Sequence, residues 1–219
     1  MANSARARMI AAAERLAAER GLGATSLREV QLAADQRNKS AAHYHFGSRE
    51  GLIEAVLVAR MGPINERRVE LLLALDARGD GADRRGLLEA FVRPIVEHTI
   101  ARPGSHWARF LLQCAADPLV ADIVARSAEG HGYRDVVNRL AAGLDHLPPA
   151  LRTSRLEYMQ GLVFTSLAAT EHSLGTRRTP RLPVEAQLND LVDLCLAILE
   201  RPPSAETLAS IPARLLTAR

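Results

Sequence analysis

The sequence predicts an all-α fold of about nine helices. Alanine, leucine and arginine dominate the composition, and aromatic residues make up only 4% of the chain. Alternation of β-branched with polar residues, which is the pattern of a half-buried strand, is hard to find anywhere. With 219 residues, 47% of them apolar, the chain is long enough to bury a sizeable core in one or two domains.

The first predicted helix covers residues 4–20. Gly21 follows it and is placed to end the helix in a left-handed cap, since glycine has no Cβ to clash there. Apolar residues recur at helical spacing along the segment and form its buried face: Ile10, Ala13, Leu16 and Ala17.

The second and third predicted helices are short and are joined by a polar turn. Ser26 and Glu29 have the spacing of a capping box, in which each residue reaches the other, so the second helix begins near Ser26. Residues 35–38 interrupt its apolar rhythm and end it, and Asn38 is a good N-cap for a third helix over about 39–45. The second helix is expected to bury three residues: Leu27, Val30 and Ala34.

A fourth helix is predicted over about residues 49–75, because Gly47 ends the third helix and Ser48 caps the next. Pro63 is expected to bend or interrupt it, since a proline ring does not fit a straight helix interior. Later helices are predicted between breaks at proline, glycine and polar clusters: 84–101, 105–116, 119–144, 151–174 and 184–200.

The net charge of +3 is concentrated at one end of the chain. Residues 1–60 hold nine Lys/Arg against six Asp/Glu, whereas the remaining residues hold nineteen of each. A basic module attached to a neutral body indicates an anionic partner for that module. His43 and His45 add to its positive charge when they are protonated.

The same basic module carries a motif in three separated parts: Thr25-Ser26-Leu27-Arg28-Glu29-Val30, Lys39-Ser40, and Tyr44-His45-Phe46-Gly47-Ser48-Arg49-Glu50-Gly51-Leu52. In spacing and residue types this motif resembles the DNA-binding domain of the TetR family of transcriptional regulators. The chain departs from the family form in its turn, Ala34 to Asn38, which is one residue longer. Asp35 also stands where glycine is usual.

The resemblance implies two domains and a function. Residues 1–50 would form a three-helix helix-turn-helix DNA-binding domain, and residues 51–219 an α-helical ligand-binding and dimerisation domain. The expected protein is a cytoplasmic, ligand-responsive regulator. As a repressor it would bind a palindromic operator as a homodimer and be released by a small-molecule inducer.

Double-stranded DNA is therefore the expected partner of the head. Helix N-termini attract phosphates, so we expect contacts to the DNA backbone at or near the starts of these helices, from Ser26, Arg28, His43, Tyr44 and Arg49. Base contacts are expected from Arg37, Asn38, Lys39 and Ser40. Lys39 is the only lysine in the chain. His45 is a DNA contact or a packing residue, whereas Phe46 is expected to be core.

The last two long helices are the expected homodimer interface. The final one carries more apolar surface than a one-sided helix requires: Val184, Leu188, Leu191, Val192, Cys195, Leu196, Ile198 and Leu199. The helix before it has small residues, such as Gly161 and Ala169, that permit close approach. The alternative is that both helices are simply buried within one subunit.

If the family's small-molecule site carries over, larger or adaptable side chains of the middle helices are its candidates. The effector itself is not identified by the sequence. Apolar and aromatic candidates are Trp107, Phe110, Cys114, Tyr158, Met159 and Phe164, and polar candidates are His98, His106 and Arg109. Each apolar candidate can instead be an ordinary core residue.

Other functions find less support in the sequence. No nucleophile motif, phosphate loop or metal-ligand spacing is present, so neither an enzyme nor a metal or cofactor site is predicted. No apolar stretch reads as a secretory signal or a membrane span. Two alternatives stay open, namely a helical interaction protein that has lost DNA affinity and a redox-responsive regulator that uses Cys114 and Cys195.

Overall fold

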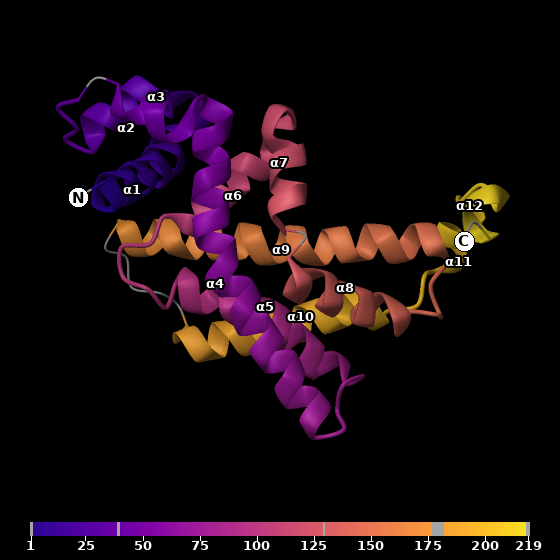
Figure 1. Cartoon of the computed structure of the whole chain (residues 1–219). Helices are drawn as coiled ribbons and strands as arrows, with labels where there is room; N and C mark the ends of the chain where they lie inside the picture. Colours follow the sequence, from indigo (N-terminus) through magenta and orange to yellow (C-terminus); the bar gives the residue numbers. More distant parts are fainter. Residues whose placement is uncertain (1, 39, 129, 177–181, 218–219) are drawn as a thin grey trace.

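Figure 1 shows a computed structural model of the chain, which describes residues 2–38, 40–128, 130–176 and 182–217. Every regular element in these segments is helical, which confirms the all-α prediction. The first three helices gather at one end of the long helix α4 (Arg49–Ala77), and most later helices pack along the rest of α4 or behind it (Figure 1). The last two short helices lie apart from α4, at one end of α9 (Pro149–Gly175).

The head begins with α1 (Ala2–Arg20), which matches the first predicted helix. Its predicted face is buried, as are Met9 and Ala12 beside it. Gly21 ends the helix with a φ of 84°, a backbone conformation that glycine adopts at little steric cost. A single 3-10 turn, Leu22–Ala24, then leads to α2 (Leu27–Ala33).

The backbone at the end of α2 explains how Asp35 can stand where glycine is usual. The amide of Asp35 donates to the carbonyl of Leu32 (3.1 Å), and the amide of Gln36 donates to the carbonyl of Gln31 (3.0 Å). These two bonds form a Schellman motif, which requires a left-handed residue after the helix. Asp35 takes that place with a φ of 50°. Aspartate tolerates this conformation better than most residues other than glycine.

The third helix begins later than predicted. Helix α3 covers Ala41–Phe46, and its N-cap is Ser40 rather than Asn38. The Asn38 side chain instead accepts a hydrogen bond from the Ser40 amide (3.0 Å), which closes a turn before the helix. Arg37 and Asn38 therefore lie in the link between the helices, whereas Lys39 lies outside the described residues.

Helix α4 (Arg49–Ala77) connects the head to the body. Ser48 caps it as predicted, since its hydroxyl accepts from the Gly51 amide (3.1 Å). Pro63 does not interrupt the helix, so that part of the prediction is wrong. The residue faces solvent, where water can satisfy the carbonyl left without an amide partner. One continuous helix thus packs on α1 and α3 and also on α5, α7 and α8.

The body consists of α5 (Arg84–His98), α6 (Trp107–Ala116), α7 (Pro118–Ala128), α8 (His131–Ala142), α9 (Pro149–Gly175) and α10 (Val184–Glu200). Two short helices follow, α11 (Ala205–Ala209) and α12 (Ala213–Thr217). The predicted boundaries of α10 are confirmed. The prediction of about nine helices is too low for the described residues, because α11 and α12 are too short to show a helical period and because one predicted helix divides.

The single helix predicted over 119–144 is wrong, since it is the pair α7 and α8. Gly130 between them has an extended backbone (φ −56°, ψ 149°). A Cβ on Gly132 would lie 2.5 Å from the carbonyl oxygen of Asn65 on α4. The two glycines therefore let the start of α8 approach α4 closely. Because this approach requires a change of chain direction after α7, the two helices are separate.

Helix α5 ends at His98, three residues before the predicted end. Thr99 leaves the helical conformation (φ −120°, ψ −99°), and its hydroxyl donates to the carbonyl of Ile95 (2.7 Å). This local bond competes with continuation of the helix. The segment that follows includes Ser105 and His106, and it lies against α1 of the head.

The apolar stripe of α10 that was predicted to form the dimer interface is largely buried inside the subunit. Five of its eight residues are core: Leu188, Leu191, Val192, Cys195 and Leu199. They pack against α5 and α9 of the same chain. These five residues are core residues of their own subunit, so they fit the alternative that the stripe is buried within one chain. The use of α9 and α10 as a homodimer interface stays a prediction.

Candidate nucleic-acid interface and ligand cavity

Helix α3 has a buried face that fixes it to the head and an exposed face that leaves side chains free. Phe46 is 8% exposed, with the guanidinium of Arg6 on α1 placed 5.6 Å from its ring centre. Ala41 and Ala42 are also buried, which brings α3 close to α2. Tyr44, only two residues from Phe46, is 85% exposed. The core prediction for Phe46 is confirmed.

Arg28 and His43 lie at the same surface groove between α2 and α3, together with Leu27, Gln31, Leu32 and Ala42. Arg28, His43 and Tyr44 are all exposed. The structure thus brings two predicted phosphate contacts, Arg28 and His43, together at one groove, whereas Tyr44 is exposed on α3 next to His43 in the chain. Ser40 and Arg37 are exposed at the start of α3 and in the link before it. His45 is half-buried, between the rings of Tyr44 and Phe46.

Two further predicted DNA residues, Ser26 and Arg49, are engaged with the protein itself. Ser26 caps α2, and its hydroxyl both accepts from the Glu29 amide (3.2 Å) and donates to the Glu29 carboxylate. The Glu29 carboxylate meets the Ser26 hydroxyl rather than the Ser26 backbone, unlike the predicted box. Arg49 donates to the carbonyl of Leu22 (3.0 Å) and lies 4.0 Å from the carboxylate of Asp117. Arg49 therefore ties the head to the corner between α6 and α7.

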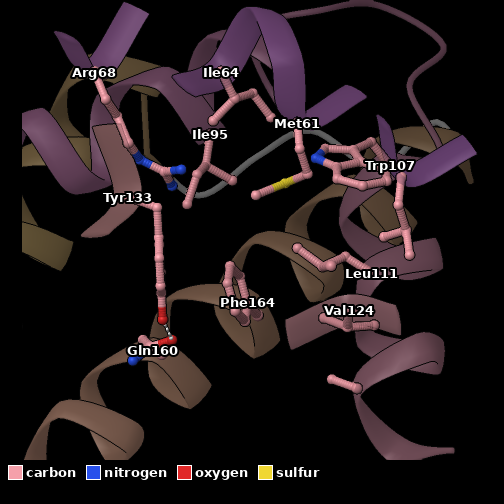
Figure 2. A pocket seen from close by; sticks show the side chains of 12 residues that line it. Met61, Ile64, Arg68, Ile95, Trp107, Leu111, Val124, Tyr133, Gln160 and Phe164 are labelled. Carbon is pink, nitrogen blue, oxygen red and sulfur yellow. Dashed lines mark hydrogen bonds between the residues drawn. The ribbon is translucent and has the colours of Figure 1, made fainter. Parts of the chain in front are cut away.

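A cavity of about 290 Å³ lies in the body and is lined by residues of α4, α5, α6, α7, α8 and α9 (Figure 2). Apolar side chains make most of its wall: Leu57, Met61, Ile64, Ile95, Trp107, Leu111, Ala115, Val124 and Phe164. Polar side chains come from Arg68 on α4, Tyr133 on α8 and Gln160 on α9. An apolar wall with a few polar groups is typical of a small-molecule site.

The polar groups of the cavity are incompletely paired. The Tyr133 hydroxyl donates to the Gln160 side-chain oxygen (2.7 Å). Arg68 donates from Nη1 to the Asn65 side chain (2.8 Å), but its Nε finds no acceptor. The indole Nε1 of Trp107 is also buried without an acceptor. Such unpaired buried donors cost free energy unless something else supplies an acceptor.

Arg68 is the most unusual residue of the cavity, since its side chain is charged and only 1% exposed. The guanidinium lies 5.2 Å from the ring centre of Phe91 and 5.7 Å from that of Tyr133. Burial lowers the pKa of the guanidinium to about 10, and the Tyr133 hydroxyl opposes part of that decrease. The group therefore stays positively charged at neutral pH.

Two of the nine predicted ligand residues, Trp107 and Phe164, line this cavity. Phe110, Cys114 and Met159 are buried outside its wall, and Phe110 stacks on Trp107. Tyr158 lies on the outside of α9, with 65% of its surface exposed. The three polar candidates serve other contacts, and their partners are the Pro94 carbonyl for His98, Glu19 for His106 and Glu171 for Arg109.

Arg68 was not among the predicted ligand residues, although the sequence carries a signal for it. Residues of α4 that face the body recur at helical spacing: Leu57, Met61, Ile64, Arg68, Leu72 and Leu75. An arginine in such a stripe is a charge placed at a core position. The four cavity residues that come from α4 are the first four members of this stripe.

Both cysteines are buried and free, which bears on the redox alternative. Burial raises the pKa of Cys114 to about 12 and the pKa of Cys195 to about 12. Because the thiolate is the reactive form, we expect both thiols of the native chain to react with iodoacetamide at pH 8 at least about a hundredfold more slowly than in urea. Rapid labelling of the native chain would favour a redox role.

Comparison with known families decides what the head is. Residues 9–56 match the family model described as bacterial regulatory proteins, tetR family. This segment corresponds to the N-terminal helix-turn-helix region of TetR family regulators. The match covers most of α1, all of α2 and α3 and the first part of α4, so the exposed α2 and α3 surface lies in a segment typical of DNA-binding transcriptional regulators.

Two further findings concern the molecule beyond its head. Curated proteins compared with it give no match. Among the described residues, no helix is long and apolar enough to cross a membrane. The TetR-type head is therefore the part of the molecule whose function is identified, whereas the role of the body has to be argued from its cavity and surfaces.

Proposed function

We propose that the chain is a ligand-responsive repressor that binds a palindromic operator as a homodimer and is released by a small-molecule inducer. One observation carries the proposal. Helix α4 starts in the TetR-type head and contributes Leu57, Met61, Ile64 and Arg68 to the wall of the body cavity. A ligand in the cavity therefore contacts the same helix that supports α1 and α3.

On this proposal residues 1–50 form the DNA-binding head and residues 51–219 the effector and dimerisation body. The boundary falls in the first turn of α4. Arg28, His43 and Tyr44 contact phosphates, and base contacts come from residues 37–40, which lead into α3 and include Lys39. Ser26, His45 and Arg49 mainly hold the head together, since each already has a partner or ring contact inside the protein.

The homodimer is proposed to form through the outer faces of α9 and α10. Tyr158, Gly161 and Ala169 are exposed on α9, and the position of a Cβ on Gly161 has no neighbour within 4 Å. Leu194 and Ala197 are exposed on α10. Small side chains around a large one suit close helix packing, and a two-fold assembly matches a palindromic operator.

The inducer acts by binding the two states of the protein unequally. The Glu14 carboxylate on α1 is buried and accepts from Arg60 on α4 (2.5 Å), which couples the head to that helix. A ligand that fits the cavity best when α4 is displaced would move α1 with it. The ligand then favours a spacing of the two heads that does not match the operator.

The proposed DNA binding by the head is tested by its dependence on salt concentration. The affinity of the purified chain for genomic DNA fragments is measured by fluorescence anisotropy between 50 and 200 mM salt, and about six phosphate contacts predict a loss of about a thousandfold. Replacing Arg28 and His43 together by alanine should make the slope of log affinity against log salt shallower by about one to two. This change follows from the loss of two phosphate contacts.

Arg78→Ala is the matched control. Arg78 is an exposed arginine that directly follows the last residue of α4, at the end opposite the head, and its only ion-pair partner among the described residues is Asp80. Its removal should leave the slope unchanged. A wild-type affinity that does not respond to salt would overturn the DNA-binding proposal and favour a helical interaction protein.

A further inference from the structure

We propose that the ligand of the body cavity is a small apolar monocarboxylate whose carboxylate pairs with Arg68. The inference rests on the proposed effector role of the cavity and names the chemical class that would fill it. Neither the family match nor the overall fold specifies that class. It follows from the charge and hydrogen-bonding groups of the cavity wall.

Arg68 lacks the partner that a buried cation requires. Within the described part of the chain, Asn65 is its only hydrogen-bond acceptor, and no carboxylate forms an ion pair with it. Neighbouring Arg67, which is far more exposed, has two carboxylate partners, Glu70 and Glu97. A charge that is moved out of water without a counter-ion is strongly disfavoured, and ring contacts with Phe91 and Tyr133 offset only part of this.

Other polar groups of the cavity wall also have hydrogen-bond donors without an acceptor. Gln160 uses its oxygen to accept from Tyr133, which leaves its amide N–H groups available. The Trp107 indole N–H is unpaired and lies across the cavity from Arg68 (Figure 2). No aspartate or glutamate lines the described cavity wall. A wall that offers donors and one positive charge is complementary to an anion.

The charge and the size of the cavity restrict the chemical class of the anion further. One guanidinium balances one negative charge, which favours a carboxylate over a phosphate dianion. The rest of the wall is apolar and suits a hydrocarbon or aromatic tail. The cavity of about 290 Å³ has the volume of roughly ten waters at about 30 Å³ each, so a ligand of about ten non-hydrogen atoms fills it.

Octanoate and octanamide form a matched pair of probes, since both have eight carbons and two polar atoms but only octanoate is charged. Binding of each to the full-length chain is measured by isothermal titration calorimetry at pH 7. Octanoate should bind at least about tenfold more tightly than octanamide, because the charge-assisted pair forms only with the acid. Equal affinities, or no binding of octanoate, would overturn the proposal.

Arg68→Met tests the residue itself. Methionine is unbranched and apolar, so the variant removes the charge while largely filling the space, and circular dichroism checks its fold. It should lose the preference for octanoate over octanamide, whereas Arg67→Met, at the exposed neighbouring position, should keep it. A preserved preference in folded Arg68→Met would contradict the assignment. Should Arg68→Met not fold, the wild-type comparison of the two probes still decides the proposal.

The effect of octanoate on DNA affinity is measured separately from its binding. Loss of DNA affinity with octanoate supports both the cavity assignment and the inducer role. Binding of octanoate without any effect on DNA overturns the inducer role and leaves the ligand class intact. Normal salt-dependent DNA binding together with no octanoate binding overturns the ligand class alone.

Discussion

Replacement of Phe46 by alanine is expected to abolish DNA binding while the body stays folded. Phe46 is the large buried side chain of α3, and Arg6 of α1 lies against its ring. Truncation of a buried phenylalanine costs about 3–5 kcal/mol. Since α3 has only six residues and cannot persist without its packing, the loss should detach it from the head. At about 1.4 kcal/mol for each tenfold, affinity should fall by at least about a hundredfold.

Tyr44→Ala is the control for this substitution, because Tyr44 lies two residues away on the same helix but faces solvent. It should weaken binding to all DNA sequences about equally and leave the thermal unfolding temperature unchanged. Trp107, the only tryptophan, reports on the body, and its emission should be the same in both variants. Intact DNA affinity in Phe46→Ala would show that α3 does not depend on this anchor.

Replacement of Glu171 by alanine should destabilise the body by about 3–5 kcal/mol, the range for removing one partner of a buried charged pair. Glu171 lies on α9 and is only 3% exposed. Its carboxylate accepts from the amides of Ala108 and Arg109 (3.2 and 3.0 Å) and from the Arg109 side chain (3.4 Å). It therefore holds the free N-terminus of α6 against α9, beside the cavity residue Trp107.

Urea denaturation monitored by Trp107 emission measures this loss. Glu171→Gln keeps one acceptor oxygen but removes the charge, so its effect should be intermediate. Glu157→Ala, on the exposed side of the same helix, should change the free energy of unfolding by less than about 0.5 kcal/mol. If Glu171→Ala proved as stable as Glu157→Ala, the contacts across α6 and α9 would contribute little to the fold.

Local features were predicted best where a residue type has one dominant use. The capping residues Ser26 and Ser48 and the end of α1 at Gly21 could be predicted because each satisfies backbone groups of its own helix. The start of α3 could not be placed the same way. Asn38 can cap either a helix or a turn, and only its hydrogen bond to the Ser40 amide decides between them.

The pocket was predicted less well than the head. Trp107 and Phe164 were found because large side chains commonly line cavities, but Phe110 and Met159 have the same property and are simply core. Periodicity indicates that a residue faces inward without showing whether space is left beside it. Arg68 was overlooked for a related reason, since an arginine in a charged stretch of a long helix looks like a surface residue until its spatial neighbours are known.

The sequence by itself determined the helical class, the basic head and its helix-turn-helix motif, because these depend on composition and on contacts between residues close in the chain. The tertiary structure decided which apolar faces are core, how α7 and α8 separate around Asn65, and that α4 joins the head to the cavity. These features depend on volume shared between distant helices. The buried charge of Arg68 belongs to the same group, since burial is a property of the packed chain.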